Sequence, residues 1–217
     1  MDKQSILVIV ESPSKIEKIK KYLNEIYKDK HDFIVKASYG HIRDLDTKKL
    51  SIDIDKNFKP IYILSQSKER VISELKHANK KCQEVWIASD DDREGEAIAF
   101  HISEILAIKP PKRKRITFSE ITKQAIKSAC ENPKDINMDM FYAQQARRII
   151  DRLIGYLISP VLWKQIQNST KKKISLSAGR VQSVVMKLII EREKEINKFE
   201  SSSFYKTIGN FNNSTCN

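Results

Sequence analysis

Acidic side chains are concentrated in one short segment, residues 87–102, which reads IASDDDREGEAIAFHI. Asp90, Asp92 and Glu94 are spaced by two, so in an extended backbone they project to one side while the residues between them point away. An apolar run that is typical of a buried strand delivers the chain to this segment. Three carboxylates gathered on one side of a strand end are suited to holding a cation.

A second apolar run, SILVIV, ends in Glu11. Ligands bind at the carboxyl ends of strands in open α/β sheets, so we expect Glu11 to meet the three acids there. Two unit charges about 4 Å apart repel by about 4 kcal/mol at an effective dielectric of about 20, and a hard divalent cation offsets this repulsion. The sequence therefore predicts a Mg²⁺ site with all-oxygen ligands, formed by Glu11, Asp90, Asp92 and Glu94.

The alternative for the acidic run is a purely local one. Acidic residues at a helix N-terminus are stabilised by the helix dipole and by water, with no metal involved. The apolar strand before the run, and the matching position of Glu11 after the other strand, favour the metal. Gly95 is expected to give the backbone the freedom to turn tightly into the following helix.

Two further side chains could contact a phosphate. Lys15 lies four residues after Glu11, near the start of a predicted helix, and a helix N-terminus with an adjacent lysine suits a phosphate group. His41, in GHIRDL, could contact a phosphate or transfer a proton. The alternatives are a solvated lysine among many and a loop histidine that caps a turn.

Alternating strands and helices must position these residues. Ser12 is a plausible N-cap of the first helix, with Pro13 at the first helical position. The alternation predicts an α/β fold, a parallel sheet covered by helices on both faces. The expected strands are 5–11, 32–38, 84–89 and 115–118, and the expected helices are 12–27, 67–81, 95–106 and 122–131.

The pattern changes near residue 137. Residues 138–166 and 177–196 have helical periodicity with no strand signal between them, which predicts an all-α domain. We place a domain boundary near residue 135. The predicted domains are 1–135, 136–200 and a further domain that begins at 201–217 with a strand lacking a partner in this chain.

One stripe of the first of these helices could bind nucleic acid. Gln145, Arg148, Arg152 and Tyr156 recur at helical spacing. Two guanidiniums in line with an aromatic ring suit the phosphates and bases of a single strand. The alternative is a solvated polar face on which Arg147 and Asp151 form an i,i+4 pair.

The composition agrees with a polyanionic partner. The 217 residues include 40 Lys and Arg against 28 Asp and Glu, a net charge of +12. A merely soluble, lysine-rich protein is the competing interpretation, and the clusters Lys109–Arg115 and Lys171–Lys173 fit either one. The three cysteines are far apart, which excludes a disulfide framework, and no apolar stretch approaches the length of a membrane span.

Several motifs together resemble those of the type IA DNA topoisomerases. ASDDDREGEAIAFH, VIVESPSK and SYGHIRDL are similar to the Toprim region of that family, where a strand-end Glu and a D-x-D-x-E set form a Mg²⁺-dependent site. The later motifs follow in the family's order: FSEIT, AQQARRIIDRLIGY, SPVLW and LSAGRVQS. The resemblance covers essentially the whole chain.

The resemblance implies roles for individual residues. Glu11 would be the acid/base residue beside the scissile phosphate, and Lys15 would stabilise the developing phosphoryl charge. Asp90, Asp92 and Glu94 would handle Mg²⁺. It also implies that Asp92, Arg93 and His41 belong to the catalytic set. The residues that it implies for the DNA-binding groove are Arg148, Asp151, Arg152, Tyr156, Ser177, Arg180 and Gln182.

In this family a tyrosine cuts one DNA strand, and x-Arg-Thr-Asp follows it. None of the tyrosines at 22, 27, 39, 62, 142, 156 and 205 has that context. We therefore expect the N-terminal part of a topoisomerase that relaxes negative supercoils, with single-stranded DNA and the C-terminal part of the enzyme as partners. The expected location is cytoplasmic, or nucleoid-associated in a bacterium. A stand-alone Mg²⁺-dependent DNA-binding module and a Toprim nuclease are the alternatives.

Overall fold

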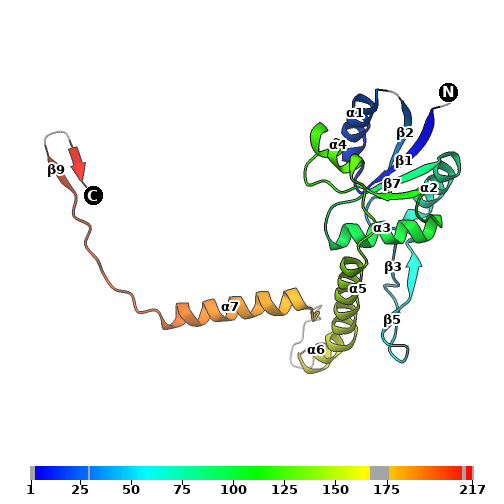
Figure 1. The fold of residues 1–217 in the computed structure, drawn as a ribbon. Coiled ribbons are helices and arrows are strands. Elements are labelled where there is room, and N and C mark those ends of the chain that lie inside the picture. Colours follow the sequence, from blue (N-terminus) through cyan, green and yellow to red (C-terminus); the bar gives the residue numbers. More distant parts are fainter. Residues whose placement is uncertain (1–2, 29, 167–175, 212–213, 217) are drawn as a thin grey trace. The chain divides into compact units, whose positions relative to one another are not determined.

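The computed structural model describes residues 3–28, 30–166, 176–211 and 214–216. The chain forms two compact units, Met1–Tyr156 and Leu157–Asn217. The unit Met1–Tyr156 contains the four-stranded sheet (Figure 1). All of the residues predicted to be catalytic belong to this unit.

Four parallel strands form the centre of the first unit, in the order β2-β1-β7-β8. The predicted α/β class with a parallel sheet is confirmed. The fourth strand ends at Arg115, the residue at which the sequence placed its start. The strands are β1 (Gln4–Val10), β2 (His31–Ala37), β7 (Glu84–Ala88) and β8 (Arg113–Arg115).

Helices cover both faces of this sheet. Residues Ile6–Val10 are at most 1% exposed, because a central parallel strand is buried on both sides. Alternate side chains of this strand belong to two separate cores, one with α1 and α4 and the other with α2 and α3 (Figure 1). The helices are α1 (Ile16–Tyr27), α2 (Glu69–Lys81), α3 (Arg93–Leu106) and α4 (Lys123–Glu131), and short 3₁₀ turns lie at Pro13–Lys15 and Gln66–Lys68.

Between β2 and α2 the chain makes an excursion that the sequence did not predict. Two antiparallel strand pairs form there, and the segment expected to be a loop after residue 38 contains one of their strands. These strands are too short to carry a detectable alternation of apolar and polar residues. The pairs are β3 (Arg43–Leu45) with β6 (Tyr62–Leu64) and β4 (Ile52–Asp53) with β5 (Lys59–Pro60).

Helix α5 (Met138–Leu153) belongs by packing to the first unit. Its Phe141 ring stacks on Phe100 of α3 with the ring centroids 3.9 Å apart. The division by packing therefore comes at Tyr156, after this helix, whereas the predicted domain boundary lies before it. The boundary near residue 135 and the one at residue 200 stay predictions.

The second unit consists of helices followed by a pair of strands. It contains α6 (Ser159–Ile166) and α7 (Arg180–Lys198), preceded by a π-helical turn at Ile154–Ile158. The strand expected at the end of the chain forms at β9 (Gly209–Phe211). The expectation that it lacks a partner is wrong, because it pairs antiparallel with β10 (Ser214–Cys216).

A buried ion pair fixes the end of β7. Arg115 is 1% exposed, and its Nε donates to Glu96 Oε1 at 2.8 Å. The same guanidinium donates to the backbone carbonyls of Ser89 and Asp90, both at 2.7 Å. The other carboxylate oxygen of Glu96 accepts from the backbone N–H of Asn137, at the start of α5, at 3.0 Å. One ion pair thus joins β7, β8, α3 and α5.

Gly95 is required by close packing. A Cβ atom at this position would lie 2.0 Å from the carbonyl oxygen of Asp90, which no side chain could tolerate. The Gly95 N–H donates to Asp92 Oδ1 at 2.7 Å, and its carbonyl accepts from the Ser89 hydroxyl at 2.7 Å. Glycine is therefore needed here because the start of α3 packs closely against the end of β7, and not because the chain must turn, as expected.

Arg115→Met should destabilise the protein by about 3–5 kcal/mol, because it leaves the buried Glu96 carboxylate without its partner. The double variant Arg115→Met/Glu96→Met should recover much of this loss. Urea unfolding followed by circular dichroism measures both. Lys123→Met, which breaks an exposed pair with Glu25, is the matched control and should cost less than about 1 kcal/mol. Equal losses in Arg115→Met and Lys123→Met would show that the buried pair has no special role.

Candidate functional site

The parallel strands bring the two predicted halves of the site together. Val10 of β1 is in register with Ala88 of β7, so the residues that follow each strand meet at one edge of the sheet. There the Lys15 ammonium pairs with the carboxylate of Asp90. Glu11 lies at the same edge, directly after β1, with a partly buried side chain.

Glu94 lies in the first turn of α3 and contacts two other elements. His41 Nε2 is 2.8 Å from Glu94 Oε2, and Gln144 Nε2 of α5 donates to the same oxygen at 3.1 Å. Gln144 was missed in the sequence, although it lies four residues before Arg148 and therefore on the same stripe. The carboxylate of Glu94 is about half exposed and thus open to a ligand.

The remaining acids have separate surroundings. Asp92 caps α3, and Arg93 and Asp91 are exposed beside it. Asp91 Oδ2 is 3.9 Å from the Lys134 ammonium. Among the residues that the structure describes, no three His, Cys, Asp or Glu side chains come close enough together to hold a metal ion. Protein groups thus contact the acids of this loop.

The donor set nevertheless fits Mg²⁺ in its chemistry. Its members are all carboxylates, the ligand type this ion prefers, and Asp90 and Glu94 are each about half exposed. The Lys15 ammonium occupies the position beside Asp90 that a metal ion would take. A bound ion would therefore replace Lys15 as the partner of this carboxylate.

The arginine stripe of α5 is not a solvated face. Arg148 makes a two-pronged contact with the carboxylate of Asp44, through Nε at 3.0 Å and through Nη2. Arg152 Nη1 donates to the carbonyls of Asp46 at 2.7 Å and Lys49 at 3.1 Å. The two guanidiniums thus tie α5 to β3 and to the segment that follows it. Tyr156 is 44% exposed at the end of the same stripe.

A cavity of about 260 Å³ joins this stripe to the acidic loop. Its lining includes Glu94 and His41 at the acidic end and Arg147, Arg148 and Asp151 along α5. A second cavity of about 260 Å³ continues along the helix from Arg148 to Tyr156. Most residues predicted to bind DNA in the first unit therefore line one connected path that starts at a predicted metal ligand.

Arg43, Tyr62 and His101, which line the cavity that reaches Glu94, were also missed in the sequence. His101 is 2% exposed, and burial lowers its pKa to about 3, so the imidazole is neutral at neutral pH. Its Nδ1 accepts a hydrogen bond from Arg43 Nε at 2.6 Å, which leaves its proton on Nε2. The Tyr62 ring packs edge-on against this imidazole, 4.6 Å between centroids. A histidine within the apolar part of a predicted helix gave no distinguishing signal in the sequence.

The other predicted DNA contacts belong to the second unit. Ser177 and Arg180 flank the start of α7, and Gln182 Nε2 lies 3.0 Å from the hydroxyl of Ser177. The cluster Lys171–Lys173 lies outside the described residues.

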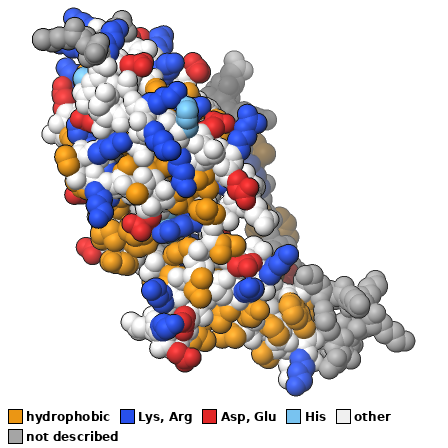
Figure 2. All heavy atoms as spheres, turned by 90° about the vertical axis from the view of Figure 1, so that its right-hand side faces the viewer, with side chains coloured by type: hydrophobic (Ala, Val, Ile, Leu, Met, Phe, Trp, Pro, Cys, Tyr) orange, Lys and Arg blue, Asp and Glu red, His pale blue; other side chains and the backbone are white. Residues whose placement is uncertain are grey.

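The cluster Lys109–Arg115 is mostly engaged within the protein. Arg113 pairs with Asp135 at 2.7 Å, and Lys114 pairs with Glu84 at 2.8 Å. Together with the buried Arg115, these contacts give the cluster a structural role. Elsewhere, Lys and Arg side chains lie spread over the face of the molecule in Figure 2, with Asp and Glu between them. None of the helices in the described parts of the chain is long and apolar enough to cross a bilayer.

Comparisons with known proteins agree with this architecture. Residues 6–121 match the Toprim domain family, and residues 135–216 match a DNA topoisomerase family. The solved structure of full-length topoisomerase I from Thermotoga maritima is 44% identical in sequence, with a TM-score of 0.75 over 89% of this chain. The chain spans 31% of the length of that protein. It belongs to the type IA DNA topoisomerases, of which it contains the N-terminal region.

Proposed function

We propose that this region holds one DNA strand and supplies the acid, base and metal-binding groups with which a type IA topoisomerase breaks and rejoins it. The observation that carries the proposal is the connected path from Glu94, past Arg148, to Tyr156. A strand lying along the path would have its phosphates near guanidiniums and one phosphate beside the acidic loop. Relaxation of negative supercoils would be the activity of the whole enzyme.

The side chains at the acidic end have distinct roles in this proposal. Glu11 gives a proton to, or takes one from, the oxygen that leaves or attacks the phosphorus. Lys15 balances the charge that develops on the phosphoryl oxygens, with Arg93 and His41 close by in the catalytic set. Asp90, Asp92 and Glu94 would hold Mg²⁺. When bound, the ion supplies positive charge to the phosphate oxygens.

The nucleophilic tyrosine of the reaction would come from elsewhere. No tyrosine of this sequence precedes x-Arg-Thr-Asp, so the C-terminal part of the enzyme is the proposed partner that provides it. Ser177, Arg180 and Gln182 would add further contacts to the strand. The proposal includes single-stranded DNA as the substrate and the cytoplasm as the site of action.

The double variant Asp90→Asn/Glu94→Gln should weaken Mg²⁺ binding in isothermal titration calorimetry. The expected loss is at least the roughly 10-fold seen when only an outer partner of a metal ligand is removed. Asp91→Asn removes a charge from the same run and should leave the affinity nearly unchanged. Equal affinities in all three proteins would exclude a metal site here, and matching thermal unfolding in EDTA would show that the variants are folded.

Arg148→Ala combined with Arg152→Ala should weaken the binding of oligo-dT by roughly 10-fold or more, measured by fluorescence anisotropy. The same change breaks the contacts of α5 with β3 and with the segment after it, so we also expect a lower melting temperature. Asp44→Asn is the companion variant. This variant removes the charge that pairs with Arg148 and leaves the guanidinium free to bind phosphate. The variant should therefore bind oligo-dT at least as tightly as the unchanged protein. Weakening in both would mean that only the packing of α5 matters.

Incubation of the chain alone with supercoiled plasmid and Mg²⁺ tests the division of the active site. We expect binding without relaxation and without covalent attachment of DNA to protein, because the nucleophile is supplied by the partner. Relaxation with covalently trapped DNA would identify a nucleophile among the tyrosines of this chain. Incision without trapping would instead indicate a nuclease that uses an activated water.

A further inference from the structure

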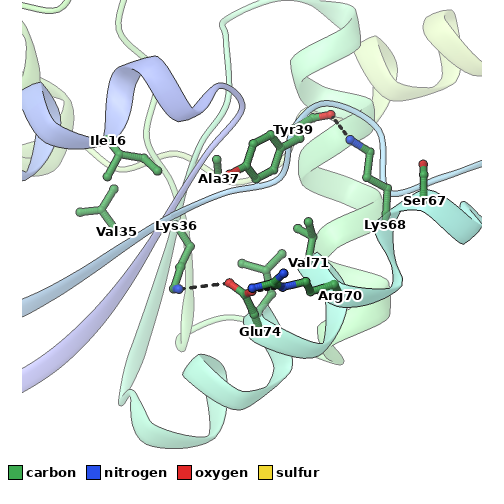
Figure 3. A pocket seen from close by; sticks show the side chains of 11 residues that line it. Ile16, Val35, Lys36, Ala37, Tyr39, Ser67, Lys68, Arg70, Val71 and Glu74 are labelled. Carbon is green, nitrogen blue, oxygen red and sulfur yellow. Dashed lines mark hydrogen bonds and ion pairs between the residues drawn. The ribbon is translucent and has the colours of Figure 1, made fainter.

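A third cavity, of about 600 Å³, includes Tyr39 of the loop after β2 in its lining (Figure 3). It is formed by the exposed edge of β2 and the start of α2, and we call it the β2–α2 groove. The residues of the groove that matter here are Lys36, Tyr39, Ser67, Lys68, Arg70 and Glu74.

Tyr39 presents an aromatic ring to this groove. It is 52% exposed and has a left-handed backbone with φ of 58°, which is uncommon for a bulky residue and often marks a functional position. Lys68 holds it there. The Lys68 ammonium donates to the Tyr39 carbonyl at 2.6 Å and lies 5.5 Å from the centroid of the ring. The ring is therefore both fixed and open on the side of the groove.

The groove carries an excess of positive charge. Its one carboxylate, Glu74, is 3.2 Å from both Lys36 and Arg70. Lys68 donates to a neutral carbonyl and so keeps its charge available to an anion. The Arg70 side chain is 91% exposed, so most of its donors face solvent. A fixed aromatic plane beside cations is the combination that binds single-stranded nucleic acid.

The position of the groove relates it to the acidic end of the sheet. Tyr39, Gly40 and His41 are consecutive, and the Gly40 N–H donates to the carbonyl of Glu11 at 3.3 Å. His41 contacts Glu94. Residues of one short loop thus line the groove and contact Glu94 of the acidic site.

We propose that the β2–α2 groove is a second contact for single-stranded DNA, in which a base stacks on Tyr39 and neighbouring phosphates pair with Lys68 and Arg70. The inference rests on the proposed function, since it extends the path of the same substrate beyond the acidic loop. It adds a binding site to the one on the stripe of α5.

The test compares three variants by fluorescence anisotropy with labelled oligo-dT at several salt concentrations. Tyr39→Asn removes the ring but keeps a residue that tolerates the left-handed backbone, and it should weaken binding about 10-fold. Lys68→Met/Arg70→Met should lower the slope of log affinity against log salt by about 1.4, which is two phosphate contacts at about 0.7 each. Lys76→Met/Lys80→Met removes the same charge from the same helix outside the groove and should leave the slope unchanged.

The outcomes separate the two proposals. The groove is not a DNA site if Tyr39→Asn binds like the unchanged protein and the Lys68→Met/Arg70→Met variant has the same salt slope as its control. The proposed function still stands in that case if Arg148→Ala/Arg152→Ala binds more weakly. If the unchanged protein does not bind oligo-dT at all, both proposals fail. Binding restored by Tyr39→Phe supports stacking over a change in the loop. If dTMP competes as tightly as oligo-dT, the groove binds a free nucleotide and the proposal that it binds a DNA strand is overturned.

Discussion

The candidate active site depends on one buried charge pair. Removing Arg115 and Glu96 from water costs several kcal/mol per ion, and the pair is tolerable because every neighbouring group contributes a hydrogen bond. Those bonds end on the backbone of Ser89 and Asp90 and on the first residue before α5. The acidic loop is therefore attached to the core through its backbone. Its carboxylates can face solvent and change partners without moving the chain that carries them.

Neighbouring acids of the loop each contact a different protein group. Asp90 has an ammonium, Glu94 has an imidazole and an amide, and Asp92 has a backbone N–H of its own helix. Each carboxylate thus meets a complementary group, and mutual repulsion, which would otherwise cost several kcal/mol, is largely offset. Under the proposed function, Mg²⁺ would take the place of one or more of these partners.

The sequence predicted those parts of the structure that depend on local pattern. The apolar run of β1, the alternation of strands and helices, and the placing of Glu11 and the acidic loop at one edge of the sheet were predicted from such patterns. The contact of Lys15 with Asp90 was not predicted. Arg115 could not be recognised, because within KPPKRKR it looks like any solvated cation. Asp44 and Arg148 are 104 residues apart, and only the fold makes them partners. Gly95 was noticed, but its reason lies in a contact with Asp90 that no local pattern encodes.

The contact between Asp44 and Arg148 has a consequence for selectivity. The Asp44 carboxylate pairs with this guanidinium. Under the proposed function, a phosphate that binds Arg148 would have to compete with Asp44, so charge alone would gain less there than at an unpaired arginine. A ligand that also offers a base to Tyr156 would have a further source of affinity that sulfated sugars or free phosphate lack. Internal competition of this kind would then favour nucleic acid over other polyanions.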